Sequence, residues 1–303
     1  MNAIHYLASL YAFLIFMGLC TNSLIVLTTI RTKTLHSTCN ILIAFCALSD
    51  ILHQIGHLSK IIPIFEGTTE ISSYTCSISQ IVPNFGLSAG VILVFLISID
   101  RLLSVHFSPS FIHKNSHFIL MCHIIAIIAY ASLQYSFAII YFEERNVICS
   151  PPEIYHGKGK ELWGMTSLSV IILSIIVYYV VWRELKNTGV RAGLSHTRRV
   201  FRSVFAVMCT LILGWLLTMT IIVIDRFVLD LEGRAMYIGE EVAGIPANTA
   251  LTLNFFVLYN TSVEYRNAFR RQLRTIPFIR RCLPNNKVLS LSIETTFVKS
   301  QSS

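Results

Sequence analysis

Polar side chains recur along one face of an otherwise apolar segment near residue 50. Asp50 is followed by His53, Gln54, His57 and Lys60, at offsets of three, four, seven and ten residues. In an α-helix these offsets place all five side chains on the same face. Such a face could line a hydrated cavity, hold a cation or relay a proton. The simpler alternative is a polar seam that packs between neighbouring helices.

A second charged group, Asp100-Arg101, follows a long apolar run. A carboxylate can hold a neighbouring guanidinium through a charge-assisted hydrogen bond. When it is released, the guanidinium offers a planar fork of donors that lysine lacks. The alternative interpretation is two ordinary charges at the end of a membrane helix.

The elements that position these residues must be membrane helices. Hydrophobic residues make up 54% of the 303 residues and charged residues only 13%, whereas about a quarter of a soluble protein is charged. A spanning helix needs about 20 mostly apolar residues. Seven stretches meet that requirement: 1–30, 40–62, 77–99, 118–142, 162–182, 203–224 and 242–263. We therefore predict an all-α membrane protein, a bundle of seven transmembrane helices.

The distribution of basic residues predicts the orientation of the bundle. Cytoplasmic loops carry an excess of Lys and Arg. If the residues after the last span are cytoplasmic, most of the 24 Lys and Arg residues lie inside, and most of the acidic residues lie outside. We therefore expect the N-terminus to be extracellular and the C-terminus cytoplasmic, in the plasma membrane.

This topology leaves two of the eight cysteines, Cys76 and Cys149, on the outer side. The extracellular space is oxidising, so a disulfide between Cys76 and Cys149 is predicted. The other cysteines fall within the membrane or on the reducing side.

The chain divides into a seven-span unit (1–263), a short helix (264–276) and a flexible cytoplasmic tail (277–303). In the short helix Tyr265, Phe269, Leu273 and Ile276 recur at helical spacing beside a stripe of arginines. That pattern predicts an amphipathic helix on the inner leaflet, with membrane lipid as its partner.

Several motifs resemble those of the rhodopsin-like G protein-coupled receptors. From the first span onward they are Gly18 with Asn22, Leu48-Ser49-Asp50, Asp100-Arg101-Leu102 and the eighth-helix segment 262–269. More narrowly, residues 35–44 and 50–57 are similar to the nematode serpentine chemoreceptors of class srsx. The resemblance covers nearly the whole chain.

The resemblance implies a chemosensory receptor that binds a small external ligand, a small molecule or a peptide, and activates a heterotrimeric G protein. It suggests the sensory cilium as a location, and implies no cofactor, metal or nucleic acid. It assigns G-protein coupling to Asp100, Arg101 and Leu102. It assigns a polar hub or sodium site to Asn22, Asp50 and Asn254, and an activation switch to Trp215 and Tyr259. We expect the ligand pocket in the outer half of the bundle, with His57, Lys60, Asn84 and Phe85 as candidates.

Two motifs depart from the family pattern. The seventh-helix Asn-Pro-x-x-Tyr is replaced by Asn254-Phe255-Phe256-Val257-Leu258, with Tyr259 one place late, and the sixth-helix Trp-x-Pro is replaced by Trp215-Leu216-Leu217. Without these prolines the usual kinks are not expected at those places.

A small proton- or ion-coupled transporter is the alternative function, with Asp50, His53 and His57 as its relay. Transporters usually contain paired repeats, which this sequence lacks, and seven spans do not divide into halves. An enzyme is not expected, because the sequence has no nucleophile elbow, phosphate-binding glycine loop or metal-spaced ligand set.

Overall fold

The computed structural model describes residues 2–67, 70–187, 194–229, 231 and 233–274. The predicted tail (277–303) and the last residues of the predicted amphipathic helix lie outside this part of the chain.

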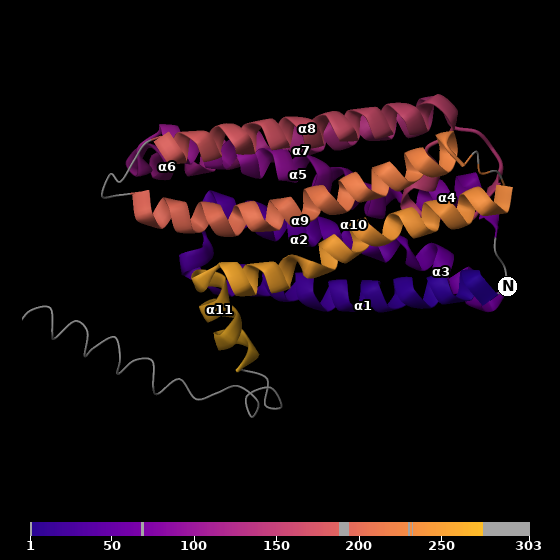
Figure 1. Ribbon diagram of the computed structural model, residues 1–303, viewed down its shortest axis with the longest axis horizontal. Coiled ribbons are helices and arrows are strands. Elements are labelled where there is room, and N and C mark those ends of the chain that lie inside the picture. Colours follow the sequence, from indigo (N-terminus) through magenta and orange to yellow (C-terminus); the bar gives the residue numbers. More distant parts are fainter. Residues whose placement is uncertain (1, 68–69, 188–193, 230, 232, 275–303) are drawn as a thin grey trace, which may run out of the picture.

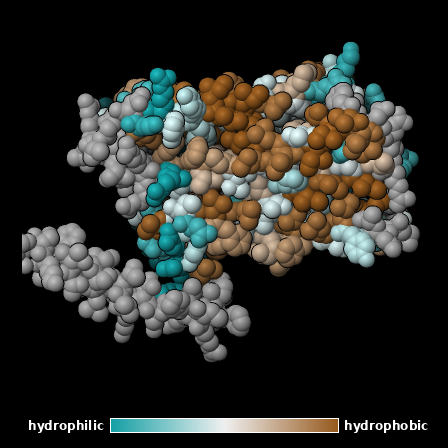
Figure 2. All heavy atoms as spheres, in the orientation of Figure 1, coloured by the Kyte–Doolittle hydropathy of each residue, from teal (hydrophilic) through white to brown (hydrophobic). Residues whose placement is uncertain are grey.

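Seven helices in the described residues are long and apolar enough to span a membrane. The spans are Ile4–Arg31, Thr38–Glu66, Ile81–His106, Ser116–Ile140, Gly157–Lys186, Phe201–Asp225 and Ala235–Thr261. They lie side by side as an elongated bundle (Figure 1), and the face shown in Figure 2 is mostly apolar along its middle. The seven-helix prediction is confirmed, and the chain is a multi-pass membrane protein.

Eight helices form the seven spans, because the second span consists of two consecutive helices. These are α1 (Asn2–Arg31), α2 (Thr38–Gly56) with α3 (Leu58–Glu66), α5 (Ile81–His106), α7 (Ser116–Ile140), α8 (Gly157–Asn187), α9 (Leu194–Phe227) and α10 (Gly233–Thr261). The shorter elements are η1 (Lys33–Leu35), β1 (Ile71–Ser72), α4 (Ser73–Ser79), α6 (Pro109–Lys114), β2 (Asn146–Val147), η2 (Pro151–Ile154) and α11 (Val263–Leu273). We call the end with α4 and the β1–β2 pair the disulfide end, and the end with α6 and α11 the Arg101 end (Figure 1).

The second span is interrupted at His57, where α2 passes into α3. Pro63, inside α3, has no N–H to donate to the preceding turn. A methyl group on Gly56 would lie 2.6 Å from Cβ of Pro83 and 2.9 Å from Cγ of Pro151. Gly56 therefore permits close contact between the second span, the third span and the loop after α7.

The third span begins later than the sequence indicated. Residues 73–79 form the separate helix α4, and the spanning helix α5 starts only at Ile81. Pro83 explains the break, because it cannot donate to the carbonyl group four residues earlier. Cys76 therefore lies on α4 and not at the outer end of the spanning helix itself.

Pro246 lies inside α10, on the disulfide side of Asn254. The proline missing after Asn254 thus has a counterpart two turns earlier in the same helix. A methyl group on Gly214 of α9 would meet Cβ of Ala250 at 2.5 Å and the carbonyl oxygen of Pro246 at 3.0 Å. The backbones of α9 and α10 therefore pack closely at this level.

The helix after the last span is present as α11. Ser262 caps it by accepting a hydrogen bond from the backbone N–H of Tyr265 at 3.3 Å. Tyr265 is 2% exposed and Phe269 0% exposed, so the apolar face of α11 packs onto the bundle.

Candidate functional site

The polar face predicted on the second span points into the bundle. The side chains of Asp50, His53, Gln54, His57 and Lys60 are all buried. Lipid cannot hydrate such groups, so each needs a partner from another helix.

Lys60 forms a buried ion pair with Glu241 of α10. Its ammonium group also lies 3.6 Å from the centre of the Tyr11 ring, on α1. The Tyr11 hydroxyl donates a hydrogen bond of 2.9 Å to the backbone oxygen of Glu241. Gly244 has no room for a side chain, because the Tyr11 hydroxyl occupies that space. One cation therefore joins the first, second and seventh spans.

Glu241 is not among the site residues predicted from the sequence, which places it with the outward-facing acidic residues. The signal that could have found it is Lys60 itself. A lysine inside a span requires a counterion. Two acidic residues, Glu240 and Glu241, occur near the start of the seventh span. A search for that counterion would have begun with Glu240 and Glu241.

Aromatic rings continue inward from this ion pair. The ring centres of Tyr11 and His57 are 5.1 Å apart, and those of His57 and His53 are 5.2 Å apart. His53 in turn stacks on Trp215 of α9 at 6.3 Å, with an angle of 17° between the rings. Neither ring nitrogen of His57 has a hydrogen-bond partner. The rings connect the disulfide end of the bundle to its middle.

Asp50 lies at the inner end of this series. Nδ2 of Asn254 donates a hydrogen bond of 2.8 Å to Oδ2 of Asp50. A cavity of about 10 Å³ is bordered by Asp50, His53 and Trp215, which is close to the smallest volume that holds one water molecule. No cluster of three or more His, Cys, Asp or Glu suited to a metal ion occurs in the described residues.

Asn22, the third residue of the expected hub, has no direct hydrogen bond to Asp50. Its Nδ2 donates instead to the backbone oxygen of Leu251, at 3.3 Å. Asn22 is fully buried, so its amide tethers α1 to α10 one turn away from Asn254. Asp50 and Asn254 are hydrogen-bonded to each other, Oδ1 of Asn22 has no partner, and the hub of three residues stays a prediction.

The two pocket candidates on the third span point in different directions. Asn84 is fully buried, and its Nδ2 donates a hydrogen bond of 2.6 Å to the backbone oxygen of Pro151. Phe85 is 38% exposed on the surface of the bundle. Asn84 therefore anchors the loop that covers the bundle, and the place of Phe85 in a ligand pocket stays a prediction.

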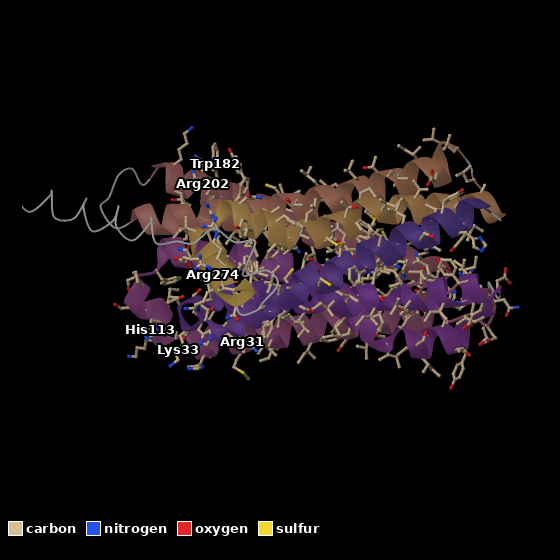
Figure 3. The ribbon with its side chains drawn as sticks, turned by 90° about the horizontal axis from the view of Figure 1, so that it is seen from below. Arg31, Lys33, His113, Trp182, Arg202 and Arg274 are labelled. Atoms are coloured by element: carbon tan, nitrogen blue, oxygen red, sulfur yellow. A yellow bond between two sulfur atoms is a disulfide. The ribbon has the colours of Figure 1, made fainter. Side chains whose placement is uncertain are left out.

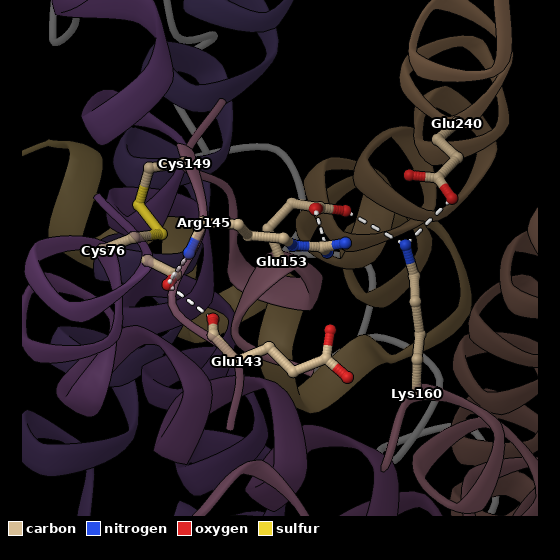
Figure 4. A network of polar contacts seen from close by, with 8 residues as sticks. Cys76, Glu143, Arg145, Cys149, Glu153, Lys160 and Glu240 are labelled. Carbon is tan, nitrogen blue, oxygen red and sulfur yellow. Dashed lines mark hydrogen bonds and ion pairs between the residues drawn. A yellow bond between two sulfur atoms is a disulfide. The ribbon is translucent and has the colours of Figure 1, made fainter. Parts of the chain in front are cut away.

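That loop is fixed by the predicted disulfide, which is confirmed. Cys76 and Cys149 are bonded, with their Cα atoms 5.4 Å apart (Figure 4). Next to the bond, β1 and β2 pair in antiparallel fashion, with Ile71 opposite Val147.

An ionic network extends from this loop across the disulfide end (Figure 4). Nζ of Lys160, at the start of α8, lies 3.0 Å from Oε1 of Glu153 and 2.9 Å from Oε1 of Glu240 on α10. Arg145 lies 3.7 Å from the other oxygen of Glu153. Burial alone would raise the pKa of the Glu153 carboxyl, but Lys160 and Arg145 hold that pKa below its ordinary value. Glu153 is therefore ionised at neutral pH and links the loop to two spans.

At the opposite end, Arg101 is held by its neighbour in the chain. Nε of Arg101 donates to Oδ2 of Asp100 at 3.2 Å, and Nη2 donates to the same oxygen. The side chain of Asp100 is 4% exposed and that of Arg101 is 12% exposed. Leu102 is half-buried against the main apolar core. The guanidinium is thus paired at the end of the third span.

The two candidate switch residues have different surroundings. Trp215 is 9% exposed and borders the small cavity beside Asp50. Tyr259 is half-buried, and its hydroxyl accepts a hydrogen bond of 3.1 Å from Nε of Arg270 on α11. Tyr259, which is one place late in the motif, thus contacts α11. This contact is separate from the polar side chains around Asp50.

The comparison with protein families agrees with these features. Residues 15–273 match the family described as serpentine type 7TM GPCR chemoreceptor Srsx. No curated protein matches the chain. The family match does not favour the transporter alternative, since it describes a receptor that couples to G proteins. The chain therefore belongs to the Srsx family of serpentine chemoreceptors, and it is a seven-transmembrane chemosensory G protein-coupled receptor.

Proposed function

We propose that the receptor binds a small external ligand at the disulfide end and activates a heterotrimeric G protein at the Arg101 end. In this assignment the disulfide end is extracellular, as is the N-terminus, and the C-terminus is cytoplasmic. The receptor would act in the plasma membrane, with the sensory cilium as the location to examine first. The observation that carries the proposal is the buried ion pair of Lys60 and Glu241, joined by stacked rings to Asp50.

The ion pair suits ligand recognition because it is costly to disturb. Removing one partner of a buried pair leaves an uncompensated charge, at about 3–5 kcal/mol. A ligand whose polar head replaces one partner therefore favours a different packing of the second and seventh spans. The ring of His57, near Lys60, could hydrogen-bond such a head. Asn84 contributes by holding the covering loop in place.

The rings offer a route for this change toward the middle of the bundle. His57 contacts His53, and His53 stacks on Trp215. A shift of these rings would alter the small cavity beside Asp50 and the hydrogen bond from Asn254. The receptor would then move between two packings of the same helices, a population shift that the ligand biases.

Arg101 is the proposed output of that shift. At rest it is paired with Asp100. Released, its guanidinium can hydrogen-bond backbone carbonyl groups of the G protein. Leu102 adds an apolar contact at the same surface, and Tyr259 links the last span to α11 through Arg270.

The test is a chemical panel applied to receptor reconstituted with a G protein, with nucleotide exchange as the signal. For any active compound, Lys60→Met and Glu241→Gln should change basal activity or shift potency. Ser169→Ala is the matched control, because Ser169 is exposed on α8 and bonds only within its own helix. Unchanged potency and basal activity in both ion-pair variants would contradict the proposed ligand region.

A further inference from the structure

The loop between α7 and α8 enters the bundle, although loops usually run over the surface of a protein. In residues 150–156, every side chain is buried or half-buried. Tyr155, near the end of this segment, is 0% exposed and is among the largest fully buried side chains of the described residues. A large side chain from a loop therefore fills space between the spans, at the disulfide end (Figure 3 shows that the bundle is lined with side chains along its length).

The Tyr155 ring packs against helices from several spans. It stacks on Trp163 of α8, with the ring centres 5.3 Å apart and an angle of 19° between the rings. It also belongs to an apolar cluster to which α5, α8, α9 and α10 contribute Leu87, Val91, Trp163, Ile171, Trp215 and Ala247. One loop residue thus lies in the cluster that joins the third, fifth, sixth and seventh spans.

The polar end of Tyr155 is poorly satisfied. Its hydroxyl lies near that of Ser88 on α5, which is 2% exposed, but neither oxygen has a hydrogen-bond partner. The next residue, His156, is also fully buried, and neither of its ring nitrogens has a partner. Buried polar groups without partners cost free energy. On leaving the bundle these groups would regain hydrogen bonds with water, so the tip of the loop is displaceable.

The base of the loop is fixed more firmly than its tip. Cys149 is bonded to Cys76 (Figure 4), and the backbone oxygen of Pro151 accepts the hydrogen bond from Asn84. Glu153 is paired with Lys160. Tyr155 therefore stays tethered near its site when it is displaced, and the high effective concentration of a tethered group favours its return.

We propose that Tyr155 is an internal plug, whose ring occupies an aromatic binding subsite and holds the receptor at rest. The inference rests on the proposed function, because the resting state is the one in which Arg101 is paired with Asp100. The subsite offers the flat face of Trp163 for stacking and the Ser88 hydroxyl for one hydrogen bond. It therefore suits a small aromatic molecule with one polar group. A ligand of another shape displaces the ring without restoring its resting contacts.

Binding to the subsite is measured without a G protein. Tyr155→Ala in phosphatidylcholine nanodiscs is melted with and without p-cresol, which is the side chain of tyrosine as a free molecule. We expect p-cresol to raise the melting temperature by about 2 °C or more. Tyr74→Ala is the matched control, because Tyr74 is exposed on α4 at the same end. No rise in Tyr155→Ala, or an equal rise in both variants, would overturn the subsite.

A saturated analogue tests the aromatic class. 4-Methylcyclohexanol keeps the size and the hydroxyl of p-cresol but has no flat ring to stack on Trp163. It should stabilise Tyr155→Ala clearly less than p-cresol does, and equal stabilisation would show that the aromatic assignment is wrong. If Tyr155→Ala does not fold, the same comparison is made with Tyr155→Leu and phenol, since leucine leaves a smaller space.

Nucleotide exchange tests the restraint on activation. Tyr155→Ala should raise basal exchange by about fivefold or more, because an active state that is a minor population at rest has room to grow. p-Cresol should lower this activity again, and Tyr74→Ala should keep the parental level. Unchanged basal exchange in Tyr155→Ala would contradict the plug. If exchange is absent in the parent and in every variant, the proposed function fails, whereas the melting experiment still decides whether the subsite exists.

Discussion

Nδ2 of Asn254 donates a hydrogen bond to Oδ2 of Asp50 over 2.8 Å, and this bond joins α10 to α2 in the middle of the bundle. Both residues are buried, at 4% and 3% exposure. Oδ1 of Asn254 has no partner, and a cavity of about 10 Å³ borders Asp50. A carboxylate with one amide donor and a water-sized space is suited to an exchangeable sodium ion or proton.

We predict that Asp50→Asn keeps the fold and removes the sodium dependence of activation. The substitution preserves the size of the side chain and its hydrogen bonding to Asn254 but removes the charge that a cation needs. Nucleotide exchange should be measured in sodium and in a large organic cation at equal ionic strength. Ser169→Ala is the control, because Ser169 is exposed on α8 and bonds only within its own helix. The hub assignment fails if Asp50→Asn responds to sodium as the parent does.

Arg101→Ala should leave surface level and ligand binding near normal and abolish G-protein activation. The reason is the loss of the planar donor group proposed to bind the partner's carbonyl groups. Arg101→Lys should restore little activity, because lysine keeps the charge without the fork. Arg183→Ala is the control for general loss of positive charge, since Arg183 is exposed on α8. Full signalling by Arg101→Ala would refute the coupling role.

The ion pair of Lys60 and Glu241 should show strong coupling in a double-mutant cycle. Lys60→Met or Glu241→Gln alone leaves a buried charge and should destabilise the receptor by about 3–5 kcal/mol. The double variant should lose much less than the sum. Thermal unfolding in nanodiscs measures each change. Additive losses would show that the pair is not energetically coupled.

Lys160→Met serves as the comparison for that cycle. Lys160 also pairs with carboxylates, but its side chain is 24% exposed. Partly exposed pairs contribute about 1 kcal/mol or less. We therefore expect a clearly smaller loss of stability than for Lys60→Met.

The number of spans could be predicted from the sequence because the membrane imposes it, whereas their limits differ by several residues, as at Ile81, where the third span begins. Every stretch of about 20 apolar residues must form a helix, and the helical spacing from Asp50 to Lys60 identifies an inward face. The disulfide followed from compartment alone, because only Cys76 and Cys149 were expected outside.

Partners between helices could not be predicted in the same way. In a membrane helix, apolar residues face both the core and the lipid. The sequence therefore does not distinguish the surroundings of Asn84 from those of Phe85. The sequence also does not give the rotation of each helix about its axis. That rotation determines that Asn254 donates to Asp50 and that Asn22 donates to the backbone of Leu251. Glu241 is not identifiable in this way, because its partner Lys60 is distant in sequence and acidic residues at span ends are expected outside the bundle.

Lowering the pH should destabilise the disulfide end through His156. This residue is 0% exposed, and neither of its ring nitrogens has a hydrogen-bond partner. Burial lowers the pKa of His156, and Arg145 adds to the shift, against the smaller opposing effects of Glu153 and Glu143. The folded protein therefore resists a proton that the unfolded chain accepts below about pH 6.5. The stabilising effect is complete above that pH and is lost as the pH falls toward the lowered pKa.

The measurement is the melting temperature in nanodiscs between about pH 7.5 and about pH 5.5, near the ordinary histidine pKa. The wild-type receptor should lose stability over this interval, and His156→Gln should lose less, because glutamine does not titrate. Glu153 does not confound the interval, since its pKa lies below the ordinary carboxyl value and its own stabilising effect is lost only at lower pH. His117→Gln is the control, because His117 is exposed and should follow the wild type. If His156→Gln melts with the same pH dependence as the parent, another group carries the acid sensitivity and the assignment to His156 is wrong.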